Sequence, residues 1–276
     1  MPLKQILVHM DADERSLERL RIARQLAHAH GAVLDALYAA SLVPLAMPYP
    51  ELGENAASLL QRELQRCAQA RAAFERDMRR PDGSATWSEL TVFPLIEGFA
   101  EQALFADLLV LGQHDPGRQH APDVPPDFVE GVLAASGRPA LVVPYTGQFE
   151  VLPRCIAIAW KPGREAMRAV IAALPLLQRA ERVHVLGWGA EPGPLVQGPR
   201  LDLRGWLRLH GVSVQWHRED QEPADLGEVL LSRVCDLSAD LLVMGCYGHA
   251  RVREWVLGGV SRTVLGSMTL PVLMSH

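Results

Sequence analysis

The segment Ala106-Asp107-Leu108-Leu109-Val110-Leu111-Gly112 decides the fold, because it occurs again as Ala239-Asp240-Leu241-Leu242-Val243-Met244-Gly245. A second match lies downstream, where Pro139-Ala140-Leu141-Val142 corresponds to Pro271-Val272-Leu273-Met274. The apolar runs that open the two halves correspond as well, residues 5–10 to residues 155–160. Matching segments that recur in the same order indicate a duplicated unit. We therefore predict two domains of one kind, residues 1–146 and residues 153–276.

Each copy alternates short, continuous apolar runs with segments of helical period, a pattern typical of strands that are buried on both faces of a parallel sheet. Strands are predicted at 6–10, 32–38, 86–92, 108–111 and 140–144, and again at 156–160, 182–186, 213–217, 241–244 and 272–274. Helices are predicted at 15–28, 56–78, 99–105 and 128–135, and again at 165–178, 201–210, 226–237 and 260–266. Such alternation indicates an α/β fold with right-handed crossovers. Ligands of these folds bind at the carboxyl ends of the strands.

Composition excludes several classes of protein. The chain has 276 residues, 49 % hydrophobic and 21 % charged, which rules out a disulfide-stapled miniature and wholesale disorder. Its net charge of −5 gives no reason to expect nucleic acid as a partner. Residues 1–149 hold 13 basic and 19 acidic side chains, and the remainder 14 and 13, so an anionic ligand prefers the second half.

The spacing of the cysteines and the hydropathy of the chain indicate the cellular compartment in which we expect the protein. The four cysteines are scattered without zinc-type spacing: Cys67, Cys155, Cys235 and Cys246. No stretch approaches the roughly 20 apolar residues that span a bilayer. We expect a soluble, cytoplasmic protein without membrane association.

A glycine loop follows the predicted strand at 241–244. Gly245, Gly248 and Gly258 form the pattern G-x2-G-x9-G, which ends where a helix is predicted to begin. Glycines allow close backbone approach, and the free N–H groups of such a loop and of the first helical turn favour an anion. Arg251 or Arg253 can add positive charge. The alternative is a packing turn that binds nothing.

With these motifs the sequence resembles the universal stress protein family in its tandem form. The resemblance rests on Asp11, the repeated segment 106–112, the glycine loop, residues 253–262 and the ending 270–274. It implies two tandem three-layer α/β/α domains with five-stranded, mainly parallel sheets, a Rossmann-like fold of the adenine nucleotide alpha hydrolase type. It also implies a homodimer, a role in the stress response, and ATP binding, with or without Mg²⁺ and with at most slow hydrolysis. The residues expected to hold the nucleotide are Gly245, Gly248, His249, Gly258, Gly259, Val260, Ser261 and Lys161.

The resemblance assigns unequal roles to the two copies. Where the second has Gly248, Gly258, Gly259 and Ser261, the first aligns Asp115, Pro126, Asp127 and Val129. Carboxylates in place of backbone donors repel a triphosphate, so we predict no ATP in the first copy. The second copy departs from the family too. Gly259 replaces the Ser or Thr expected after the third glycine, and Lys161 replaces the strand-end aspartate, which affects nucleotide selectivity more than phosphate binding.

Several residues have an ordinary structural interpretation beside the functional one. Asp11 is expected to cap the helix that follows it rather than to contact a ligand. His114, Asp115 and His120 are expected to form a solvated loop rather than a metal site, and His249 either contacts a phosphate or lies exposed. No catalytic residue is assigned, because the chain lacks the GxxxxGK[ST], SxxK and GxSxG motifs. The leading hypothesis is an ATP-binding regulator, and the alternative is a scaffold that acts without nucleotide.

Overall fold

The computed structural model describes residues 3–40, 53–79, 84–90, 94–117, 124–149, 152–189, 201–246 and 259–276, without the side chains of residues 53–57, 59 and 60. The chain divides into two compact units, with the boundary between Tyr145 and Thr146. Each unit is described by itself below. No helix among the described residues combines the length and apolar character needed to cross a membrane.

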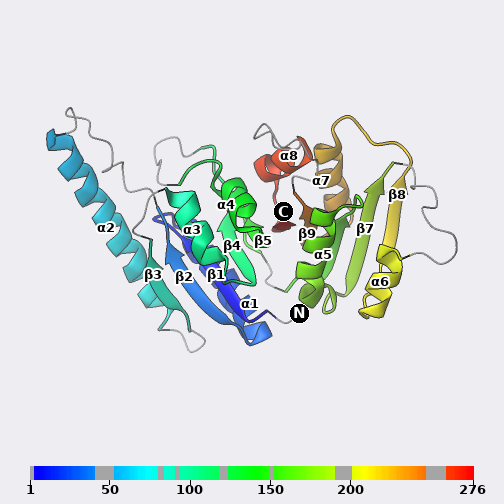
Figure 1. Cartoon of the computed structure of the whole chain (residues 1–276), viewed down its shortest axis with the longest axis horizontal. Helices are drawn as coiled ribbons and strands as arrows, with labels where there is room; N and C mark the ends of the chain where they lie inside the picture. The colour runs from blue at the N-terminus through cyan, green and yellow to red at the C-terminus, as the bar shows by residue number, and fades with distance from the viewer. Residues whose placement is uncertain are drawn as a thin grey trace. The chain divides into compact units, whose positions relative to one another are not determined.

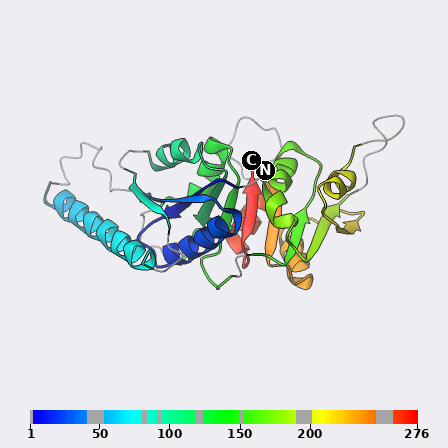
Figure 2. The same cartoon turned by 90° about the horizontal axis from the view of Figure 1, so that it is seen from below.

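The first unit is a parallel sheet with the strand order β3-β2-β1-β4-β5 (Figure 1). The α1 helix lies on one face, and α3 and α4 pack together on the other (Figure 2). The elements are β1 (Gln5–Met10), α1 (Arg15–His30), β2 (Val33–Tyr38), α2 (Gly53–Asp77), β3 (Thr86–Glu89), α3 (Leu95–Ala103), β4 (Leu108–Gly112), α4 (Phe128–Ser136) and β5 (Ala140–Val143).

The second unit repeats this plan with the order β8-β7-β6-β9-β10, again parallel throughout. Its elements are β6 (Cys155–Ala159), α5 (Arg164–Leu177), β7 (Arg182–Trp188), α6 (Leu203–Leu209), β8 (Gln215–Glu219), α7 (Leu226–Asp236), β9 (Leu241–Gly245), α8 (Gly259–Ser267) and β10 (Val272–Ser275). The α/β class, the parallel sheets and the two similar halves predicted from the sequence are thus confirmed. Element boundaries differ by a few residues, most at α3, which begins directly after Pro94.

The repeated Ala-Asp segment has a structural reason in both units. The Asp107 carboxylate accepts hydrogen bonds from the backbone N–H groups of Lys4, at 2.8 Å, and of Gln5, at 3.0 Å. Asp240 does the same for Arg154, at 2.9 Å, and Cys155, at 3.0 Å. A hydrogen bond of this kind typically contributes about 0.5 to 1.5 kcal/mol, so each aspartate stabilises the start of the central strand. The same side chain therefore fixes the register of β4 on β1 and of β9 on β6.

The strands are apolar on both faces because helices cover both faces. Residues 6–10 of β1 and 108–111 of β4 are buried, and so are residues 155–158 of β6 and 241–244 of β9. In each unit these two strands are neighbours, and the strand order reverses between them. Their carboxyl ends therefore form the switch point at which ligands of such sheets bind.

Candidate functional site

The predicted phosphate loop of the second unit starts at the switch point between β6 and β9. Gly245 ends β9, Lys161 follows β6, and Ala159 pairs with Met244 in the sheet. Gly259 is the first residue of α8, as the glycine pattern requires of a loop that feeds a helix. Gly248, His249 and Gly258, together with Arg251 and Arg253, lie outside the described residues.

The first turn of α8 brings three of the expected residues together. Gly259 is exposed, and a Cβ added to it would meet no atom of the described residues within 4 Å. Val260 is half-buried and Ser261 is buried. The N–H groups of a first helical turn have no acceptor within the helix, so they are available to an anion. A helix start of this kind is where a fold can offer N–H donors to an anion.

Gly245 has a reason to be glycine that involves no ligand. A Cβ at this position would lie 2.4 Å from the backbone N of Ala166 and 2.6 Å from the backbone C of Glu165. Only glycine lets the end of β9 approach the start of α5 so closely. The packing interpretation therefore accounts for this glycine, whereas the open surroundings of Gly259 leave that residue unexplained by packing among the described atoms.

Lys161 forms an exposed ion pair. Its Nζ lies 3.1 and 3.3 Å from the two carboxylate oxygens of Glu222, and the two side chains are 60 % and 45 % exposed. Exposed pairs of this kind contribute about 0 to 1 kcal/mol, so a phosphate can replace Glu222 at little cost. The lysine thus lies at the carboxyl edge of the sheet with a readily exchanged partner.

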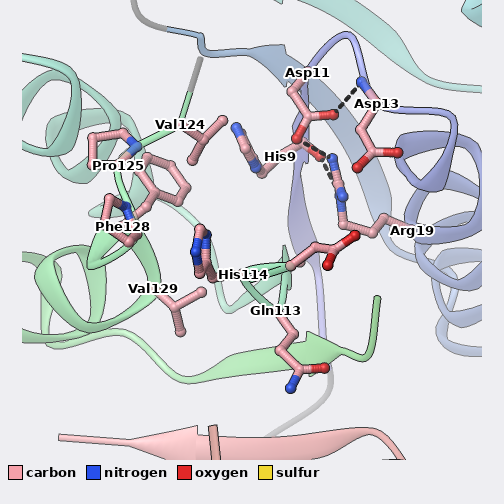
Figure 3. Close-up of a pocket in the computed structure, with 13 residues that line it drawn as sticks. His9, Asp11, Asp13, Arg19, Gln113, His114, Val124, Pro125, Phe128 and Val129 are labelled. Atoms are coloured by element: carbon pink, nitrogen blue, oxygen red, sulfur yellow. Dashed lines mark hydrogen bonds and ion pairs between the residues drawn. The ribbon is translucent and has the colours of Figure 1, made fainter. Parts of the chain in front are cut away.

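The matching edge of the first unit contains a pocket of about 80 Å³ (Figure 3). Its polar wall comes from the ends of β1 and β4 and from α1, and its apolar wall from α4 and the residues before it. Asp115, Pro126 and Val129, which the sequence aligns with the glycine loop, all line this pocket, whereas Asp127 does not. The Asp115 carboxylate accepts a hydrogen bond from the Gly117 N–H at 2.8 Å.

Asp11 and Arg19 form a buried ion pair at 2.8 Å in the polar wall (Figure 3). The Nε of Arg19 also donates to the carbonyl oxygen of His9 at 3.0 Å. Burial alone would raise the pKa of Asp11, but the Arg19 guanidinium, the neighbouring His9 and the Asp13 N–H hold that pKa below its ordinary value. Gly112 makes room for the guanidinium, because a Cβ there would lie 2.6 Å from Nη1 of Arg19.

The expectation that Asp11 caps α1 is wrong. The residue at the N-cap position is Glu14, which makes no side-chain capping bond. The Arg15 N–H instead donates to the Asp13 carboxylate at 2.8 Å, while Asp11 accepts the Asp13 N–H at 2.9 Å and pairs with Arg19. The buried arginine attracts the nearest carboxylate because a buried guanidinium without a counter-charge is costly.

His9 is a feature of this site that sequence reasoning missed. Its side chain is buried, its Nε2 donates to the Ala39 carbonyl oxygen at 2.7 Å, and its ring centroid lies 4.5 Å from that of Phe128. Burial chiefly, together with Arg19, lowers the pKa of His9 to about 4, although Asp11 and the Ala39 bond act in the opposite direction. The ring is therefore neutral at pH 7. A histidine within an otherwise apolar strand was the signal available in the sequence.

The expectation that His114, Asp115 and His120 form a solvated loop rather than a metal site can be examined only in part, since His120 lies outside the described residues. His114 is exposed and Asp115 half-buried at the end of β4. Within the described ranges, no three His, Cys, Asp or Glu side chains are arranged to hold a metal ion.

Comparison with known proteins connects this fold to a family. Residues 166–276 match the model of the universal stress protein family. A universal stress protein from Archaeoglobus fulgidus DSM 4304 is similar in structure, with a TM-score of 0.66 and 18 % identity over 98 % of this chain and 94 % of that chain. The functionally unknown protein PA1789 from Pseudomonas aeruginosa PAO1 is similar with a TM-score of 0.60 and 16 % identity, over 98 % of this chain and 92 % of that one.

At these identities the likeness to solved structures concerns the fold, and no curated protein matches the sequence. The family match covers residues 166–276 of the second unit, and the full-length structural matches extend the same fold over both units. Residues 166–276 thus match the universal stress protein family, and the first half of the chain repeats the same fold in tandem.

Proposed function

We propose that this chain is a stress-response regulator that binds ATP or a closely related nucleotide in its second half. The observation that carries the proposal is the placement of the glycine pattern. The loop leaves the sheet at Gly245, at the switch point, and enters the open first turn of α8 at Gly259. A phosphate can approach the backbone there as closely as its oxygens allow.

The charges of the two units favour this half over the other. Three carboxylates and one guanidinium line the pocket of the first unit, and the guanidinium is already paired with one of the carboxylates. Two like charges 4 Å apart repel by about 1 kcal/mol in water and about 4 kcal/mol near a protein surface. A triphosphate placed there would meet that repulsion several times over. At the corresponding edge of the second unit, Lys161 offers a positive charge instead.

Binding rather than turnover is the proposed activity. The chain contains none of the P-loop or serine-nucleophile motifs that would suggest rapid chemistry, so any hydrolysis is expected to be slow. Bound Mg²⁺, where present, would be held mainly by the nucleotide's phosphates. Association of two chains into a homodimer belongs to the same proposal, and light scattering after size-exclusion chromatography tests it.

Thermal unfolding with millimolar ATP tests the proposal. A ligand that binds only the folded chain at 100 times its Kd adds about 2.7 kcal/mol of stability, so the Tm of the wild-type protein should rise by several degrees. Gly259→Asp places the first unit's own residue, Asp127, at the equivalent position and should abolish the rise. Asp127→Asn is the matched control in the first unit and should keep it.

Two outcomes would contradict the proposal. One is a wild-type Tm that does not respond to ATP. The other is a Gly259→Asp variant that responds as the wild type does while its circular dichroism shows an intact fold.

A nucleotide-free scaffold is the second candidate, favoured by the packing reason for Gly245. A scaffold should keep its stress-survival phenotype when Gly248 is replaced by Asp, whereas an ATP-dependent regulator should lose it.

A further inference from the structure

The pocket of the first unit is a built cavity with two chemically different walls. Val124, Pro125, Phe128 and Val129 form the apolar wall; the Phe128 ring lies against His9, and Figure 3 shows Val129 beside His114. The opposite wall is polar. At about 80 Å³ the pocket is small beside the several hundred Å³ of typical drug-sized ligand sites. It therefore suits a ligand with a short body.

The polar wall is rich in carboxylate acceptors, beside which Gln113 and His114 add an amide and an imidazole. The carboxylates of Asp11, Asp13 and Asp115 line it, and the one cationic side chain among the described lining residues, Arg19, is itself buried against Asp11. The Gly117 bond occupies Oδ1 of Asp115 and leaves its second oxygen to other donors. A ligand that offers N–H groups and a positive charge would complement this wall.

His9 independently indicates that the pocket prefers a ligand with a hydrogen-bond donor. Its Nε2 faces a carbonyl oxygen, which can only accept, so Nε2 carries the proton and Nδ1 of the neutral ring is a bare acceptor. His9 is 2 % exposed and lines the pocket, yet Nδ1 has no hydrogen-bond partner among the described residues. Nδ1 is not among the fully buried polar atoms that lack a partner, so it is accessible from the pocket and can accept a hydrogen bond from a ligand.

We infer that the first-half pocket binds a small organic cation, a primary ammonium on a short apolar body. The ammonium would donate to the Asp115 carboxylate and to Nδ1 of His9, and the apolar body would pack on Phe128 and Val129. Aromatic faces also attract ammonium groups, which adds to the fit. The two halves would then differ in kind, the first taking a cation and the second an anion.

Isothermal titration calorimetry with matched probes tests this inference. The cations are butylamine, phenethylamine and putrescine, and each is paired with its carboxylate counterpart: valerate, 3-phenylpropionate and adipate. At least one amine should bind at least tenfold more tightly than its carboxylate counterpart. The titrations are run without ATP and repeated in the Gly259→Asp variant, so the result does not depend on nucleotide binding in the second half.

Variants of one loop identify the site. Asp115→Asn keeps the oxygen that accepts the Gly117 N–H but removes the charge, and it should weaken amine binding by about tenfold or more, the usual effect of losing a hydrogen bond to a charged group. Asp127→Asn removes the same charge 12 residues away, outside the pocket lining, and should change the affinity by less than twofold.

Three results would overturn the inference. They are the absence of binding by all three amines, the failure of every amine to bind more tightly than its carboxylate counterpart, and equal losses of affinity in Asp115→Asn and Asp127→Asn. Equal losses would mean that the amines respond to overall charge rather than to this pocket.

Discussion

Lowering the pH from 7 to 4 is expected to destabilise the folded chain through one side chain, His9. Burial in the first unit lowers its pKa from the ordinary 6.5 to about 4. The unfolded chain therefore binds a proton at this residue below about pH 6.5, whereas the folded chain does so only near pH 4. The contribution of His9 to stability is complete above pH 6.5 and is lost as the pH falls through this window. At about 1.4 kcal/mol for each pH unit, the loss amounts to about 3 kcal/mol.

Urea unfolding measured from pH 7 to pH 4 tests this value. The His9→Gln variant cannot gain a charge, while its amide N–H can still donate toward Ala39. The free energy of unfolding of the wild type should fall by about 3 kcal/mol more than that of the variant across this range, because the other titrating groups are common to both. His28→Gln, a change at an exposed histidine of α1, serves as the control and should follow the wild type. Parallel pH profiles for wild type and His9→Gln would refute the reasoning.

Three further changes should have distinct effects. Gly245→Ala should cost about 2 kcal/mol or more in urea unfolding because its Cβ meets the backbone of α5, whereas Gly259→Ala should cost nothing; equal effects would contradict the packing argument. Arg19→Met should lower the free energy of unfolding by about 3 kcal/mol, because it leaves a buried carboxylate without its counter-charge, and a loss below about 1 kcal/mol would show that the ion pair is not buried in solution. Burial and nearby glutamates raise the pKa of Cys67 to about 11. Iodoacetamide at pH 7.5 should therefore modify the exposed Cys235 well before Cys67, as followed by mass spectrometry, and the reverse order would contradict this.

The parts of the fold that the sequence predicts well are those specified locally. Continuous apolar runs identify the strands, since a strand covered by helices on both faces has no polar side to mark. The duplication of Ala-Asp ahead of β4 and β9 identifies the repeat, and hydrogen bonds to the backbone explain why Asp107 and Asp240 occupy equivalent places. These hydrogen bonds require only that the strand after the aspartate lies beside the first strand of its unit. The repeat already implies that strand order.

The candidate site of the first unit was harder to predict because it depends on burial. Arg19 lies in a helix rich in charged residues, where the sequence predicts a solvated side chain. In the structure it lies beneath the end of β4, where Gly112 leaves space for it. Asp11 forms an ion pair with Arg19 and therefore does not cap α1. No local pattern distinguishes a buried arginine from an exposed one, since the difference arises from the packing of α1 on the sheet.

The glycine loop likewise combines a feature that the local sequence predicts with one that depends on packing between distant segments. Its position between a strand and a helix follows from local sequence and agrees with the described ends, β9 and α8. The reason for each glycine does not follow from the pattern, because Gly245 is required by the neighbouring helix α5, which lies far away in the sequence.

Native mass spectrometry of the purified chain with ATP tests the central claim most directly, since it counts the nucleotides bound to each chain. The account predicts one ATP per wild-type chain, and none per Gly259→Asp chain under the same conditions. Two nucleotides per chain, none on the wild type, or one retained by the variant would contradict the assignment of a single anion site to the second half.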